Sequence, residues 1–159
     1  MIKEIKSKTD INYLTSLIRE SFQTVADDLN LSIENAPTHP AFIKEEKILK
    51  EHSAGNRFYG YYKENKLIGS VAIKKNNNDS YYLERLAVKP KYRHNGIGKK
   101  LIDYCIKYVK ENEGSELLIA IINENNILKK WYKDYGFKEI ETKEFEHLPF
   151  VVCFMKYKV

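Results

Sequence analysis

The chain has 159 residues, of which 43% are apolar and 31% are charged, a balance that excludes disordered and fibrous proteins. No apolar run approaches the roughly 20 residues that a membrane-spanning helix needs, and the first residues lack the apolar stretch of a signal peptide. We therefore expect one domain over residues 1–159, located in the cytoplasm and without a membrane partner.

The net charge of +5 favours an anionic ligand. The 27 Lys and Arg residues are spread along the chain without a basic block, so they do not favour nucleic acid as a partner. Cys105 and Cys153 lie far apart in apolar segments and predict buried free thiols, not a disulfide scaffold. The four histidines have no metal-ligand spacing, and we expect no metal.

Apolar residues at helical or alternating spacing, with turn residues between them, predict the elements of the chain. In chain order these are a strand over 2–6, a helix capped by Thr9 or Asp10 and reaching Val25, a loop over 30–39, a helix from Pro40 to about Ala54, strands over 57–63, 67–74 and 80–88, a helix from Gly96 to about Asn112, a strand over 116–122, a helix over 125–135, and strands over 137–146 and 150–157.

The order of these elements predicts an α/β protein, in which a mixed sheet carries helices on its faces. The three strands between residues 57 and 88 have short connections, so they form an antiparallel meander. The strand, helix and strand from residue 80 to residue 122 require one parallel pair. The almost wholly apolar run at 116–122 is typical of a strand buried on both faces.

The most informative stretch is Leu83–Lys100, where a strand leads through a loop into the first turn of a helix. Gly96 and Gly98 remove side chains from that turn, and the unpaired amides of a helix N-terminus bind phosphate. The sequence has neither the pattern of a P-loop nor the third glycine of the dinucleotide fingerprint. A plain helix start with two turn glycines remains the alternative.

The pattern Arg-x-x-Gly-x-Gly at 93–98 resembles the acyl-CoA-binding motif of the GNAT superfamily of N-acetyltransferases. Asn125, followed by the segment Trp-Tyr-Lys-Asp-Tyr-Gly-Phe at 131–137, resembles the second signature of that family. The resemblance covers about residues 57–140. It implies a GNAT-like fold, whose central, mostly antiparallel sheet has one parallel, splayed strand pair and helices on both faces.

The resemblance also implies acetyl-CoA as co-substrate. Its pyrophosphate would lie on the backbone of the glycine-containing loop, and its pantetheine between the strands that end near Val88 and Ile122. For Asn125, a helix N-cap is a second reading that does not exclude cofactor binding. The implied cofactor-binding residues are Leu86, Ala87, Val88, Arg93, His94, Asn95, Gly96, Ile97, Gly98, Lys99 and Asn125.

Two residues are candidates for proton transfer. Tyr132 stands where the family often supplies a proton to the departing thiolate, although a core or surface tyrosine is the plainer reading in a chain with 12 Tyr. Glu84 is a candidate base. Strand alternation would put it on one face with Leu86 and Val88 unless a bulge intervenes. An exposed Glu paired with a Lys, and deprotonation through ordered water, are the alternatives.

The loop over 33–43 falls where the family has its acceptor-specificity element. Glu34 could bind a cationic substrate and His39 could assist proton removal, or both could belong to a polar surface loop. We expect direct transfer of an acetyl group to a primary amine of a small molecule or peptide, by a monomer or homodimer. A catalytically silent acyl-CoA-binding module is the main alternative, and a nucleic-acid-binding protein is the other.

Overall fold

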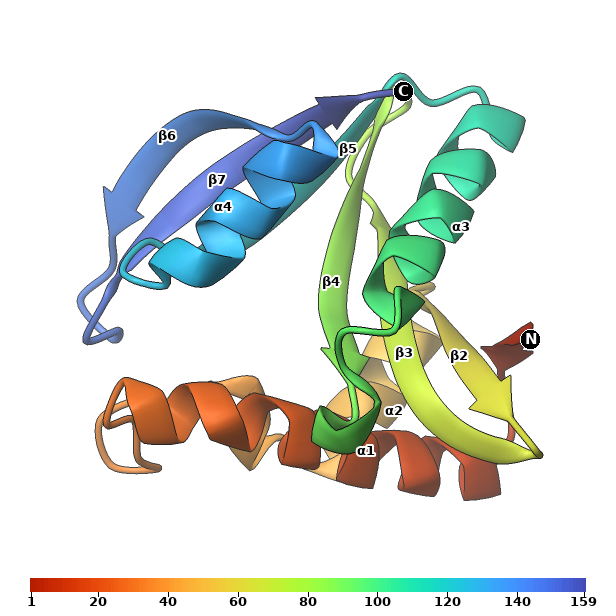
Figure 1. The fold of residues 1–159 in the computed structure, drawn as a ribbon, viewed down its shortest axis with the longest axis horizontal. Coiled ribbons are helices and arrows are strands. Elements are labelled where there is room, and N and C mark those ends of the chain that lie inside the picture. Colours follow the sequence, from red (N-terminus) through yellow and green to blue (C-terminus); the bar gives the residue numbers. More distant parts are fainter.

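The computed structural model describes residues 1–159 and contains one seven-stranded sheet with helices on both faces (Figure 1). This confirms the predicted α/β mixed sheet. The elements in chain order are β1 (Ile2–Ile5), α1 (Lys8–Asp28), the 3-10 helix η1 (Pro40–Phe42), α2 (Glu45–Ser53), β2 (Arg57–Lys63), β3 (Lys66–Lys75), β4 (Ser80–Val88), the 3-10 helix η2 (Pro90–Tyr92), α3 (Ile97–Glu111), β5 (Glu116–Ile122), α4 (Asn126–Tyr135), β6 (Lys138–Glu144) and β7 (Val151–Lys158).

Two apolar cores hold the helices to the sheet. Residues of α3 and α4 share one core with β2–β5 and β7. Residues of α1 and α2 form the second core on the opposite face of β1–β4. Both cysteines are free and buried, as predicted. No helix is both long and apolar enough to cross a bilayer.

The strand order β1-β2-β3-β4-β5-β7-β6 puts the β4–β5 pair, which is parallel, in the middle of the sheet. The pair is short. Ser80, Tyr81 and Tyr82 lie opposite Glu116, Leu117 and Leu118, and no pairing continues beyond them. The remainder of β4 pairs with β3 alone, and β5 pairs with β7 up to Ile122. The sheet therefore splits into two arms, and α1 crosses below their open end (Figure 1).

Two local predictions about the helices were wrong. Ser7 caps α1, because its side chain accepts a 3.1 Å hydrogen bond from the Asp10 amide. The helix expected from Pro40 is broken, because the backbone after η1 becomes extended at Ile43 and Lys44 before α2 begins. Ile43 is buried, and its carbonyl accepts a hydrogen bond from the Arg19 side chain of α1. These tertiary contacts outweigh the local helical pattern.

Candidate active site

The segment over residues 94–99, which leads into α3 and which we call the free-amide loop, presents a row of free backbone amides. The N–H groups of residues 94–99 donate no hydrogen bond within the protein, and the first bond of this helix runs from the Lys100 amide to the Gly96 carbonyl at 3.0 Å. His94 and Gly96 have φ values of 64° and 75°, and left-handed residues of this kind help to turn successive N–H groups into one concave surface. The first turn of α3 contains no acidic residue, so no carboxylate of that turn offsets the positive end of the helix dipole.

Space around the two glycines keeps this loop open. A Cβ atom on Gly96 would meet no other group within 4 Å. A Cβ atom on Gly98 would lie 3.3 Å from the Trp131 ring of α4. The amides beside Gly96 are therefore accessible to an anion, whereas Gly98 is needed for the close approach of α4.

The side chain of Arg93 is turned towards α1. Its Nε atom donates to the Val88 carbonyl at 3.2 Å, Nη1 to Thr24 Oγ1 at 3.0 Å, and Nη2 to the Ser21 carbonyl at 2.6 Å. The Arg93 amide donates to the Pro90 carbonyl at 3.2 Å. Neither the guanidinium nor the amide is free for a ligand, so Arg93 positions the loop. Ser21 and Thr24 had no signal in the sequence that linked them to it.

The end of β4 is connected to α1 by further hydrogen bonds. The Val88 amide donates to Ser21 Oγ at 3.2 Å, so both backbone groups of Val88 already have partners in the protein. The side chains of Leu86 and Val88 pack against the core under α3, whereas Ala87 is buried in the core under α1. The two arms of the sheet leave a cleft between β4 and β5. Beyond Tyr82, the edge of β4 that faces this cleft has no neighbouring strand.

A β-bulge changes which face of β4 carries Glu84. Ala72 of β3 lies opposite Glu84 and Ser70 opposite Ala87, so β4 contains one extra residue. Arg85, within this stretch, has a φ of 51°. The bulge that the sequence left open thus intervenes, and Glu84 does not share a face with Leu86 and Val88. Glu84 lies on the face of Ala72, which belongs to the core under α1 and α2.

Glu84 is partly buried and forms no ion pair, so the reading of an exposed Glu paired with a Lys does not hold. Burial raises the pKa of the Glu84 carboxyl above its usual value, and the charges of Lys74 and Arg85 oppose this rise. Arg85 itself is engaged by Glu51 of α2 through a bidentate pair. Glu84 is therefore a stronger base than an ordinary surface carboxylate.

Tyr132 lies in the core between α4 and the sheet, where 4% of it is exposed. Its ring contacts Trp131 and Phe137 with centroid separations of 5.0 and 5.3 Å. Burial raises the pKa of the Tyr132 hydroxyl, and the thiol of Cys105 adds to this rise. The hydroxyl thus keeps its proton throughout the neutral range.

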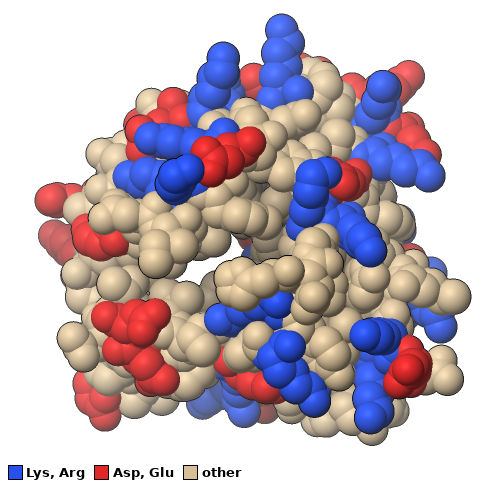
Figure 2. Space-filling model, viewed as in Figure 1, with Lys and Arg blue, Asp and Glu red and all other residues tan.

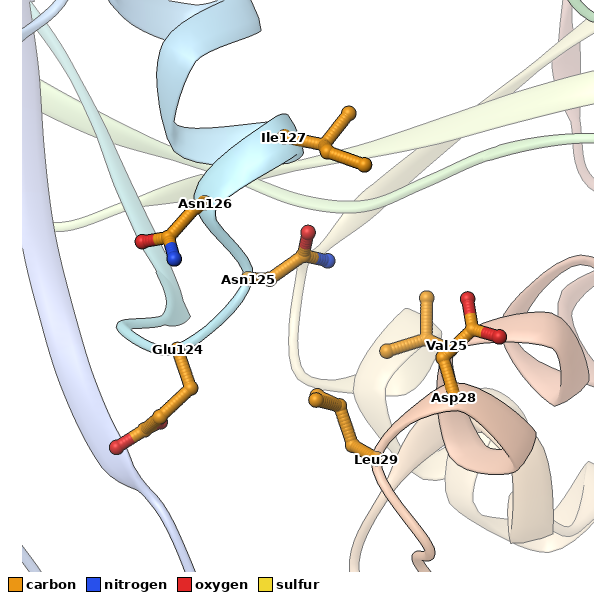
Figure 3. Close-up of a pocket in the computed structure, with 7 residues that line it drawn as sticks. All are labelled: Val25, Asp28, Leu29, Glu124, Asn125, Asn126 and Ile127. Carbon is orange, nitrogen blue, oxygen red and sulfur yellow. The ribbon is translucent and has the colours of Figure 1, made fainter.

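A pocket of ≈ 260 Å³ lies between the end of α1 and the start of α4. Figure 3 shows the Asn125 side chain extending towards α1, whereas Glu124 and Asn126 turn away from it. Asn125 also caps α4, because its Oδ1 atom accepts a 3.2 Å hydrogen bond from the Leu128 amide. Figure 2 shows an opening through the molecule between the two arms. The residues that line the pocket are Val25, Asp28, Leu29, Glu124, Asn125, Asn126 and Ile127.

The two residues predicted for the acceptor loop have different environments. His39 is 5% exposed, and its Nδ1 atom accepts a 3.2 Å hydrogen bond from the Ala41 amide. Burial between the rings of Phe22 and Phe42 lowers the pKa of His39 to about 4. His39 is therefore neutral and weakly basic at pH 7, and it caps η1. The Glu34 side chain is exposed in the preceding loop.

The structure has no cluster of metal ligands, since no three His, Cys, Asp or Glu side chains are placed to hold an ion.

A sequence profile of the acetyltransferase (GNAT) family matches residues 14–137. The protein belongs to the GNAT family of acetyltransferases. The profile match includes the free-amide loop, β5 and the whole of α4, so the resemblance of the two motifs is confirmed.

Individual proteins are also similar to this chain. The chain is 34% identical over 119 residues to UPF0157 protein YqkA of Bacillus subtilis, and this match covers 65% of the chain but 33% of that protein. It thus spans about a third of that relative's length. It is 27% identical to thialysine N-epsilon-acetyltransferase of Bos taurus, covering 92% of the chain and 89% of the relative. The structure of PaiA N-acetyltransferase from Thermoplasma acidophilum, in complex with coenzyme A, superposes with a TM-score of 0.83 at 25% identity, covering 100% and 99% of the two chains.

Proposed function

We propose that this GNAT protein transfers an acetyl group from acetyl-CoA to a primary amine, with both substrates bound at once. The observation that carries the proposal is the row of free amides at residues 94–99, at the start of α3 and beside the open arms of the sheet. A helix N-terminus with unpaired N–H groups and no acidic residue in its first turn binds phosphate oxygens well. The solved PaiA structure contains coenzyme A, which has a diphosphate.

We infer that an extended acyl-CoA molecule would bind along the loop, the edge of β4 and the start of α4. Its diphosphate would accept hydrogen bonds from the amides beside Gly96 and Gly98. Its pantetheine arm would lie in the cleft between β4 and β5, along the edge of β4 that lacks a neighbouring strand. Asn125 extends into the gap at the far side of this cleft (Figure 3). Arg93 would contribute by holding the loop against α1.

Acetyl-CoA would supply an acetyl group that is activated as a thioester. The amine acceptor must lose a proton before it attacks, because a lysine-like amine has a pKa near 10.4. Glu84 would accept that proton, directly or through water, and its raised pKa suits this role. It faces the α1 and α2 side of the sheet, so the acceptor would enter from that side.

Tyr132 would stabilise the departing thiolate. The conjugate acid of a thiolate of this kind has a pKa of roughly 8.5, which is below that of the buried tyrosine. Full proton transfer from Tyr132 would therefore be uphill. A hydrogen bond from its hydroxyl to the sulfur would stabilise the developing charge without releasing the proton.

The activities of two similar proteins support nitrogen as the acceptor atom. These are thialysine N-epsilon-acetyltransferase and PaiA N-acetyltransferase. For this chain, we propose a small molecule or a peptide that carries a primary amine. The exposed Glu34 is a candidate for holding a second positive charge of that acceptor.

Calorimetric titration of acetyl-CoA tests the cofactor site. We expect binding in the micromolar range to the wild type and no binding to Gly96→Arg, because the side chain would cover the amides. Gly55→Arg is a matched control, since Gly55 also has a positive φ of 102° and open space around it, at the end of α2. Absence of heat with the wild type would refute the proposal.

A screen of primary amines tests the transfer step. We expect release of free CoA thiol with at least one amine, and a lower rate with Tyr132→Phe. If acetyl-CoA binds but no amine supports thiol release, the protein is a silent acyl-CoA-binding module and the transfer proposal is wrong.

A further inference from the structure

Trp131 is the single tryptophan of the chain, and its indole borders the free-amide loop. It projects from α4 and remains 38% exposed. The Cη2 and Cζ2 atoms of its ring lie 3.3 and 3.4 Å from the position that a Cβ atom on Gly98 would take. The indole thus reaches from one arm of the sheet to the helix start on the other arm.

Neighbouring contacts fix the position of this ring. One turn further along α4, the Tyr135 hydroxyl donates a hydrogen bond to Asp103 of α3, and Lys99 Nζ lies 5.6 Å from the Tyr135 ring centroid. These contacts join the two helices on the side away from the open end. Tyr132 packs against Trp131 with ring planes at 74°. Trp131 is therefore held beside Gly98 while part of its surface stays in solvent.

We propose that Trp131 is a stacking platform for the adenine of acetyl-CoA. The proposal rests on the proposed function, because the diphosphate must lie on the amides of residues 94–99. A diphosphate held there brings the nucleotide half of the cofactor next to the first turn of α3, where the exposed indole lies. Adenine is the only aromatic part of acetyl-CoA, and aromatic side chains bind bases by stacking.

The single tryptophan provides a direct readout. We expect acetyl-CoA to quench the intrinsic fluorescence of the wild type, with a midpoint equal to the dissociation constant from calorimetry. Acetyl-4′-phosphopantetheine, which lacks the adenine, should bind without this quenching. Calorimetric binding of acetyl-CoA with unchanged fluorescence would overturn the platform but leave the cofactor site intact. Absence of heat with wild type would refute the proposed function and this inference together.

Variants separate adenine stacking from a role in holding the pantetheine arm. Trp131→Ala should weaken acetyl-CoA binding about tenfold or more, and Trp131→Phe should weaken it less. Neither change should alter the affinity for acetyl-4′-phosphopantetheine. Tyr13→Ala, at a 62% exposed aromatic position on α1, is the control and should bind both ligands as the wild type does. An equal loss of affinity for both ligands with Trp131→Ala would overturn the proposal.

Discussion

The Nη2 atom of Arg93 donates a 2.6 Å hydrogen bond to the main-chain carbonyl of Ser21, which lies 72 residues earlier in the chain. The same guanidinium also bonds Thr24 and Val88. The end of β4, the loop before α3 and the middle of α1 are thereby joined at one point. The free-amide loop at residues 94–99 keeps its shape because Arg93, the residue directly before it, is attached to α1 and β4.

Replacement of Arg93 should destabilise the fold. Arg93→Met removes a charged donor group and leaves partly buried acceptors on α1 and β4, so we expect the free energy of unfolding to fall by about 2 kcal/mol or more. Urea denaturation monitored by circular dichroism measures this. Arg57→Met is the control, because Arg57 is exposed and pairs with Glu4, and its loss should cost less than about 1 kcal/mol. Equal effects of both substitutions would contradict the structural role of Arg93.

Tyr132→Phe should lower turnover without weakening cofactor binding. Loss of one hydrogen-bond donor to a developing negative charge typically slows a reaction by about a hundredfold or more, whereas the ring that packs in the core is retained. Steady-state kinetics and calorimetry together test this. Because burial raises the pKa of Tyr132, its ionisation should cause no loss of wild-type activity between pH 7 and 9. Tyr13→Phe is the control for a tyrosine outside the site.

Glu84→Gln should stabilise the protein at neutral pH and slow the reaction. The raised pKa of Glu84 means that folding favours the protonated form. Its contribution is present below the unfolded pKa of about 4.3 and is lost as the pH rises through the higher folded value. The stability gain of Glu84→Gln should therefore be seen at pH 7 and vanish near pH 4. Thermal unfolding at both pH values checks this.

The activity of the wild type supplies the second test of Glu84. If this carboxylate is the base, the rate should increase with pH through its raised pKa, and Glu84→Gln should lack that limb. Glu141→Gln, on the exposed strand β6, serves as a control. A Glu84→Gln variant with the wild-type pH profile would exclude Glu84 as the base and favour ordered water.

His39 should make the fold less stable as the pH falls below neutrality. Its pKa of about 4 in the folded state is lower than the unfolded value near 6.5. The unfolded chain therefore binds a proton first, so stability is full above pH 6.5 and decreases towards pH 4. In His39→Asn, which keeps a capping side chain, urea unfolding at pH 7 and 5 should show a smaller decrease. His147 lies in the loop between β6 and β7, and the stability of His147→Asn should decrease between these pH values as much as that of the wild type.

The sequence was sufficient where local patterns decide the structure. Apolar periodicity identified the strands and main helices, and the spacing of Gly96 and Gly98 identified the loop that presents free amides. Asn125 caps α4, which is the second of the two readings that its position before a helix allowed. Each of these features depends on residues that lie within one turn or one strand of each other.

Long-range contacts explain the features that could not be predicted from the sequence. The bulge at Arg85 depends on the register against β3 and on the Glu51 pair from α2, so alternation alone placed Glu84 on the wrong face. The pocket beside Asn125 is completed by Val25, Asp28 and Leu29 at the end of α1, nearly 100 residues away. No local pattern in α1 distinguishes these positions from an ordinary helix end.

The brief pairing of β4 with β5 couples ligand binding to folding. Only Ser80–Tyr82 and Glu116–Leu118 join the two arms of the sheet by strand pairing, so a molecule in the cleft would supply contacts that the backbone does not. Because such a ligand binds the folded chain alone, it raises the unfolding free energy by RT ln(1 + [L]/Kd), which is about 2.7 kcal/mol at a concentration of 100 Kd. The melting temperature of this protein should therefore rise with the concentration of any ligand that binds in the cleft, and continue to rise after the cleft is filled.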